Sequence, residues 1–175
     1  MNRITRQENG VRKLTTVFVA SILSVTLNAF AGAPGSDPLN PDYKTTRMVK
    51  DDYAFVVDSI KEAIGDRGIK INGVNFIGKM LHRTAGAVGA TKDIYKHGQA
   101  YNFCSSTLSR ATMEADPHNI AFCPYIITIY ELTDEPGNVY VTYRKPLLVG
   151  NAASKKSLKD IGDLLDGIVK DAIGK

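Results

Sequence analysis

Apolar and polar residues alternate along the chain in two patterns, and these patterns predict its strands and helices. Apolar residues at every second position indicate a strand, whereas a recurrence every three or four residues indicates a helix. The predicted strands are 43–49, 69–77, 95–104, 120–132 and 139–146. The predicted helices run from Asp51 or Asp52 to about Arg67, from Ser105 or Ser106 to about Ala115, and from Ser154 towards the end of the chain.

Residues at the element ends agree with this division. An Asp or Ser side chain can accept hydrogen bonds from the free N–H groups of a first helical turn. Gly65 and Gly68 are expected to end the first helix, and the sequence DEPGN (134–138) predicts a tight turn between the last two strands. The final helix has a core-facing apolar stripe. This stripe consists of Leu158, Ile161, Leu165, Ile168 and Ala172.

Residues 78–94 fit neither pattern well. They could hold one helical turn, but Gly86 and Gly89 favour a mobile or tightly turned segment. The glycine-rich sequence TAGAVGA lacks the closing G-K-[ST] of a phosphate-binding loop. A turn of small residues is the simpler interpretation.

The order of elements is strand–helix–strand–strand–helix–strand–strand–helix. This order predicts an α+β fold, with an antiparallel or mixed sheet and helices packed on one face. We expect a single α+β domain over residues 43–175, preceded by a flexible leader at 32–42, because this length suffices for one hydrophobic core.

The first 31 residues have the composition of a secretory signal peptide. Arg3, Arg6, Arg12 and Lys13 make the start basic, and LTTVFVASILSVTLNAF then runs without a charge. That stretch falls short of the roughly 20 residues that a membrane span needs. Ala29 and Ala31 form an A-x-A cleavage site. We expect cleavage after Ala31 and export, most simply to the periplasm.

The charge of the chain argues against a nucleic-acid partner. The whole chain carries a formal net charge of +4. Residues 1–31 contribute four basic residues and one acid, so the chain beyond them is close to neutral. A nucleic-acid-binding domain needs clustered Lys and Arg on its folded part, whereas this chain mixes its charges, as in KKSLKDIGDLLDGIVKD.

Cys104 and Cys123 are the two cysteines of the chain, and three interpretations of them stay open. In an oxidising compartment two lone cysteines favour a disulfide. Antiparallel flanking strands would bring them together, whereas parallel strands would place them at opposite ends of the sheet. They could instead be two separate reduced thiols, or a redox or metal-binding pair. The C-x-x-C spacing of thioredoxin-like proteins is absent.

A soft-metal site is one form of the functional alternative. Met113 and His118 lie between the cysteines in the sequence. Cys, His and Met ligands together favour a copper-like site, and zinc is the other candidate metal. No pair among them has a recognised ligand spacing, so His118 is most simply a loop residue. No cofactor is predicted.

The sequence YVTYRKP presents aromatic and cationic residues near the end of a strand. Tyr140 and Tyr143 lie on opposite faces by alternation, and Arg144 and Lys145 follow them. The simpler interpretation is cross-strand packing with two solvated cations. The functional interpretation is a rim that binds an anionic ligand or partner.

Several of these segments together resemble the domain of unknown function 302 family. They are FCSS at a strand end, a short helix with ADP, then FCPYIITIYE, VYVTYRKP and a closing amphipathic helix. The resemblance covers about residues 43–172 and implies a compact α+β fold related to TATA-binding-protein-like sheets, often dimeric. It implies no activity. FCSS lacks the family's Asn-Pro step, and Cys123 precedes Pro124 where family members often place a cysteine after that proline.

The sequence therefore predicts a small exported binding or accessory domain that holds a ligand or protein partner against its sheet. The alternative is a periplasmic redox or metal-handling protein that uses Cys104 and Cys123. A conventional enzyme has less support, because G-x-S-x-G is missing and no pair of acids is placed for acid–base chemistry. A homodimer fits the resemblance.

Overall fold

The structure is a computed structural model that describes residues 37–174 of the 175-residue chain. The predicted signal peptide, and residues 32–36 of the predicted leader, lie outside the described residues. The strands are β1 (Lys44–Lys50), β2 (Ile71–Asn75), β3 (Tyr95–Phe103), β4 (Tyr125–Leu132) and β5 (Asn138–Arg144). The helices are α1 (Tyr53–Gly65), α2 (Ile77–Thr84), α3 (Ser106–Ala115) and α4 (Ala152–Ile173), with short 3₁₀ helices η1 (Gly86–Val88) and η2 (Pro117–Phe122).

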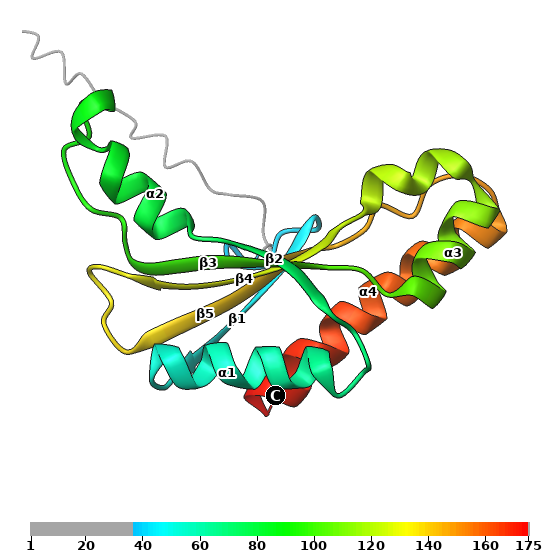
Figure 1. Cartoon of the computed structure of the whole chain (residues 1–175), viewed down its shortest axis with the longest axis horizontal. Coiled ribbons are helices and arrows are strands. Elements are labelled where there is room, and N and C mark those ends of the chain that lie inside the picture. The colour runs from blue at the N-terminus through cyan, green and yellow to red at the C-terminus, as the bar shows by residue number, and fades with distance from the viewer. Residues whose placement is uncertain (1–36, 175) are drawn as a thin grey trace, which may run out of the picture. The chain divides into compact units, whose positions relative to one another are not determined.

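The five strands form one sheet in the order β1-β5-β4-β3-β2, and every neighbouring pair is antiparallel. Helices α1, α3 and α4 cover one face of this sheet (Figure 1). The α+β prediction is thus confirmed, and the mixed-sheet alternative is excluded. Within residues 37–174, no helix is both long and apolar enough to cross a bilayer.

The core lies between the sheet and helices α1 and α4. Alternate residues of each strand point into it, as the period of two requires. Its fully buried members include Ile60, Ile64, Phe103, Ile127, Ile129, Val141, Leu158, Ile161 and Ile168. Four of the five residues of the predicted stripe on α4 are buried in the core as expected. The fifth, Ala172, is partly buried and packs against the core.

Polar side chains set the helix ends. Asp52 accepts the N–H groups of Ala54 and Phe55 at the start of α1, and Ser105 accepts the N–H of Leu108 at the start of α3. Both caps agree with the prediction. The cap of α4 does not, because Asn151 accepts the N–H of Ser154.

Two further predictions need correction. Residues 77–84 form helix α2, which is longer than the single helical turn predicted as one possibility for residues 78–94. Residues 120–122 belong to η2 and not to a strand, because Asp116 caps this 3₁₀ helix and Pro124 follows it, so that β4 begins only at Tyr125.

Helix α2 packs against the sheet face opposite to α1 and α4. A side chain at Gly78 would lie 3.0 Å from the backbone nitrogen of Gly98, so the two glycines allow the close approach. Gly98 belongs to the alternate set of β3 that points away from the core residues Tyr101 and Phe103. The expectation of helices on one face therefore holds for α1, α3 and α4 but not for α2.

Asp166 of α4 joins that helix to the edge of the sheet. Its carboxylate accepts hydrogen bonds from Arg47 at 2.9 Å and Tyr143 at 3.1 Å, and forms an ion pair with Lys170 at 2.6 Å. Partial burial alone would raise the pKa of Asp166, but Lys170, Arg47 and Tyr143 outweigh it and lower the pKa to about 2.

Replacing Asp166 with asparagine is therefore expected to destabilise the fold at neutral pH by about 2 kcal/mol. A carboxyl with a depressed pKa stabilises the fold above its unfolded pKa. That contribution is lost as pH falls through the folded value. Chemical denaturation of both proteins between pH 7 and pH 2 should show the difference shrinking below about pH 4. A constant difference across this range would contradict the assignment.

Candidate functional site

The two cysteines lie side by side at one end of the sheet. Phe103 at the end of β3 pairs with Tyr125 at the start of β4. Because these strands are antiparallel, the residue after β3 and the residues before β4 meet at the same edge, and Cys104 and Cys123 are there as two unbonded, half-buried thiols. The direction of the strands, which the sequence alone left open, places them together.

Hydroxyl groups surround the thiol of Cys123. The Ser109 hydroxyl lies 3.4 Å from its sulfur and 3.0 Å from the Tyr125 hydroxyl. Burial raises the pKa of the Cys104 thiol, and the neighbouring Cys123 raises it further. Charged groups are not among the main influences on this pKa. A fast thiol–disulfide catalyst needs the opposite, a pKa lowered by a cation or a helix N-terminus.

A shallow hollow of about 550 Å³ lies beside the thiols, and it is open to solvent. Its lining combines amide side chains with the cysteines: Asn72, Gly73, Asn75, Asn102, Cys104, Cys123 and Pro124. The hollow is too open to enclose a small molecule, but it leaves the thiols accessible from solution.

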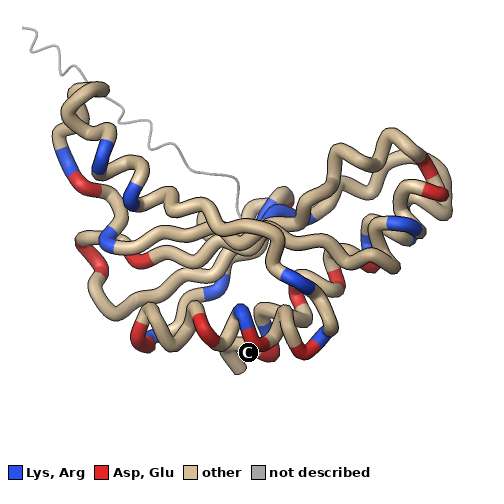
Figure 2. Tube along the Cα trace, viewed as in Figure 1, with Lys and Arg blue, Asp and Glu red and all other residues tan. Residues whose placement is uncertain are grey.

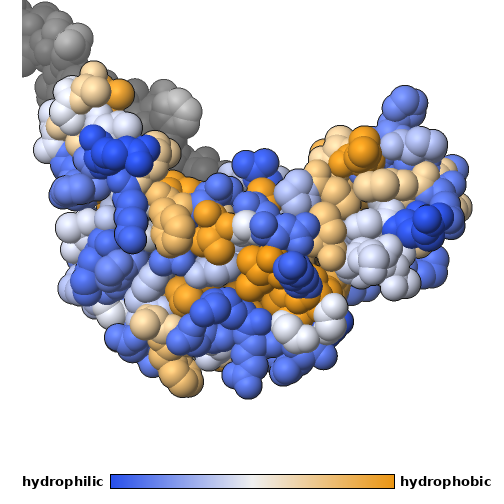
Figure 3. Space-filling view, in the orientation of Figure 1, coloured by the Kyte–Doolittle hydropathy of each residue, from blue (hydrophilic) through white to orange (hydrophobic). Residues whose placement is uncertain are grey.

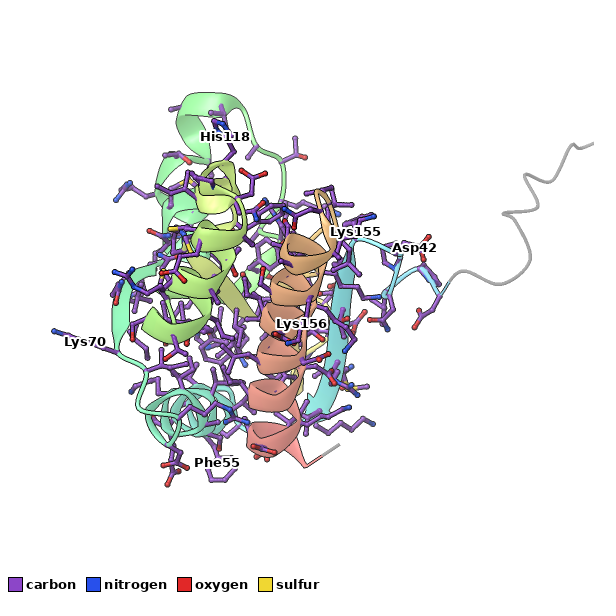
Figure 4. The ribbon with its side chains drawn as sticks, turned by 90° about the vertical axis from the view of Figure 1, so that its right-hand side faces the viewer. Asp42, Phe55, Lys70, His118, Lys155 and Lys156 are labelled. Carbon is purple, nitrogen blue, oxygen red and sulfur yellow. The ribbon has the colours of Figure 1, made fainter. Side chains whose placement is uncertain are left out.

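The other proposed metal ligands do not join the cysteines. Among residues 37–174, no three His, Cys, Asp or Glu side chains lie close enough to hold a metal ion. His118 is exposed at the start of η2, at the far end of the domain from Phe55 (Figure 4). Met113 is half-buried one turn after Ser109 on α3. A metal ion at this place would be coordinated by the two cysteine thiolates.

The two tyrosines of the predicted rim are separated by the sheet. Tyr140 stacks on Tyr130 with ring centroids 5.0 Å apart and donates its hydroxyl to Glu135. Tyr143 is buried under α4, where it donates to Asp166. Both are packing residues. Arg144 and Lys145 are exposed, and both line a groove.

This groove, which we call the end groove, lies where β4 begins and β5 ends, beside α4. It has a volume of about 400 Å³ and a mainly apolar lining. Its walls are Tyr43, Ala121, Phe122, Pro124, Tyr125, Ile126, Arg144, Lys145, Pro146, Leu147, Ile161 and Leu165. The two cations could be singled out from the sequence, but the groove could not, because its walls come from four segments far apart in the chain.

Glu131 of β4 is a buried carboxylate that the sequence did not single out. It accepts hydrogen bonds from the Gly137 N–H at 2.9 Å and from Lys96 at 3.0 Å. Burial would raise the pKa of Glu131, but Gly137 and Lys96 outweigh it and lower the pKa. Glu131 lines none of the hollows described above. Its contacts secure the β4–β5 turn, so it is a structural group.

Comparison with known proteins identifies the family. The family model "Domain of unknown function DUF302" matches residues 45–173, nearly all of the described part, and the chain belongs to this family. Its fold resembles the crystal structure of an uncharacterised conserved DUF302 protein from Bacillus stearothermophilus, with a TM-score of 0.63 and 16% identity. That match covers 75% of this chain and 99% of the other. No curated protein matches the chain.

Proposed function

We propose that this protein is a small exported binding domain that takes an organic anion with an apolar body in the end groove. One observation carries the proposal: an apolar groove has two cations, Arg144 and Lys145, in its lining. A volume of about 400 Å³ is in the range of small-molecule sites, which combine apolar walls with a few polar groups that fix orientation.

The two cations are free to meet a ligand charge. Neither Arg144 nor Lys145 forms an ion pair with an acid in residues 37–174. The Lys145 backbone N–H bonds to the carbonyl of Tyr43 at 2.9 Å, which fixes the chain at the groove wall. A carboxylate or sulfonate at this wall would gain charge-assisted hydrogen bonds, while its body would contact Phe122, Leu147 and Leu165.

The N-terminal sequence supports the proposal that the protein is exported. A basic start, an uncharged stretch and an A-x-A site support export with cleavage after Ala31, and we propose the periplasm as the compartment. The test is mass spectrometry of the protein isolated from the cell envelope, which shows whether the chain begins at Gly32.

Neutralising both cations is expected to weaken binding of an apolar anion about tenfold, because a hydrogen bond to a charged group contributes roughly 1.5 kcal/mol or more. The variant is Arg144→Gln with Lys145→Gln. The measurement is the affinity for 8-anilinonaphthalene-1-sulfonate, read by fluorescence, with decanoate and decanol as competitors.

The matched control is Lys155→Gln, an exposed cation at the start of α4 that is not part of the groove lining. It should leave affinity unchanged. Decanoate should displace the probe from the natural protein more strongly than decanol. Equal competition by the two, or no loss in the double variant, would remove the groove as an anion site.

A second candidate function rests on the adjacency of Cys104 and Cys123. Two accessible thiols side by side could bind a soft ion such as Cu(I) through thiolates, or cycle between dithiol and disulfide. This would make the protein a redox or metal-handling protein. Mass spectrometry with alkylation before and after reduction, together with metal analysis of the same sample, would separate bonded, free and metal-bound cysteines.

A further inference from the structure

The segment that contains helix α2 is rich in basic residues, although the described part of the chain is neutral as a whole. Residues 69–97 contain five cations and one acid, whereas the cations and acids of residues 37–174 balance. The cations are Lys70, Lys79, Arg83, Lys92 and Lys96. Figure 2 shows basic residues on α2 and on the loop that follows it, while α1 and α4 mix both signs.

Apolar side chains share the outer face of α2 with two of these cations. Phe76, Met80 and Arg83 follow one another at helical spacing, and they line an open hollow together with Lys79. Phe76 is 47% exposed and Met80 is 41% exposed. Lys79 lies over the Phe76 ring, with its ammonium 5.0 Å from the ring centroid. Figure 3 shows apolar and strongly hydrophilic residues side by side on this part of the surface.

The acid of the segment lies on the other side of the helix. The Asp93 carboxylate lies 3.2 Å from the His82 ring nitrogen. Both residues line a small cavity behind α2, together with Leu81 and Val88. The hollow at Phe76 has no acid in its lining. Its face therefore presents uncompensated positive charge around exposed apolar side chains, and α2 projects from the sheet (Figure 1).

We infer that this face of α2, defined by Phe76, Lys79, Met80 and Arg83, docks the protein on an anionic lipid surface. An amphipathic helix with cations around inserted apolar side chains binds at the level of the lipid headgroups. Each Lys or Arg near an anionic bilayer strengthens partitioning about fivefold. A short projecting helix can reach a flat surface without any groove.

Other occupants fit less well. The N-terminal 31 residues carry a net positive charge, and a second copy would present the same basic face, so both would be repelled. A stable protein complex buries about 800 Å² of accessible surface on each partner. Four side chains on an eight-residue helix and its N-cap residue provide less than this. A lipid surface requires neither opposite charge in this chain nor a large contact.

The chain contains no tryptophan. The fluorescence of a single introduced tryptophan therefore reports on the surroundings of that one position. The reporter is Phe76→Trp, and the matched control is Phe55→Trp, which is exposed on α1 (Figure 4). The protein is the full chain as processed and isolated from the cell envelope. It is titrated with phosphatidylcholine vesicles with and without phosphatidylglycerol, some carrying brominated acyl chains.

With phosphatidylglycerol, the emission of the F76W variant should shift to shorter wavelength and be quenched by bromine, whereas that of F55W should not. Adding Lys79→Gln and Arg83→Gln should weaken partitioning about 25-fold. Adding Lys155→Gln and Lys156→Gln should not change it. Thermal unfolding of each variant confirms its fold.

Three results would overturn the inference. The first is no quenching of F76W by anionic vesicles. The second is equal quenching without phosphatidylglycerol, and the third is equal loss in both charge variants. A response of F76W to poly-glutamate or RNA but not to vesicles would assign the face to an acidic polypeptide or a nucleic acid instead of lipid.

Discussion

Replacing Phe103 with alanine is expected to lower the free energy of unfolding by about 4 kcal/mol, because large-to-small changes of buried aromatics cost roughly 3–5 kcal/mol. Phe103 is fully buried at the end of β3. Its ring meets the Tyr125 ring edge-on at a centroid distance of 6.1 Å. The alanine would leave a cavity in the core and remove this aromatic pair.

Urea denaturation of both proteins measures the change. The control is Phe55→Ala on α1, whose side chain is 61% exposed. A surface change of this kind should alter stability by no more than about 0.5 kcal/mol. If Phe103→Ala cost no more than the control, the packing of Phe103 against Tyr125 in the core would be wrong.

The main elements could be predicted from the sequence because local patterns determine them. Strand β4 follows from the strongly apolar run at 120–132, and β5 follows from the turn at 134–138 that precedes it. Helix α4 follows from its stripe, of which Leu158 and Ile168 are fully buried. The family resemblance was confirmed over nearly the whole described part.

The wrong predictions for helix α2, for the cap of α4 and for residues 120–122 have physical causes. Helix α2 begins at Ile77, and its N-cap residue Phe76 makes no side-chain cap, so no start signal marks it. Asn151 and Ser154 can both cap a helix, but the Ser154 hydroxyl is buried and accepts a hydrogen bond from Asn119. Residues 120–122 are apolar like the strand that follows, and only Asp116 and Pro117 favour the 3₁₀ helix.

The candidate sites depend on tertiary structure, which the sequence does not determine locally. Arg144 and Lys145 could be singled out as cations, but the groove needs Tyr43, Phe122 and Leu165 from distant segments. The thiols could be proposed as a pair, yet their adjacency required the antiparallel pairing of β3 with β4. Spacing along the chain carries no information on either.

Oxidising Cys104 and Cys123 to a disulfide is expected to raise the free energy of unfolding by about 3 kcal/mol, because the bond closes a loop of about 20 residues in the unfolded chain. The thiols are already adjacent in the fold. At roughly 2–4 °C for each kcal/mol, Tm should rise by about 10 °C. Calorimetry after treatment with oxidised glutathione, with and without later reduction, measures this.

The variant Cys104→Ser with Cys123→Ser is the control, and its Tm should not respond to oxidant. If the cysteines only staple the fold, this variant should bind 8-anilinonaphthalene-1-sulfonate as the reduced protein does, because the end groove contains neither cysteine. A bond between two chains, or a lower Tm after oxidation, would contradict the expected staple. Thiols that resist oxidation and retain copper or zinc would assign the pair to metal handling, because thiolates that bind a metal are protected from the oxidant.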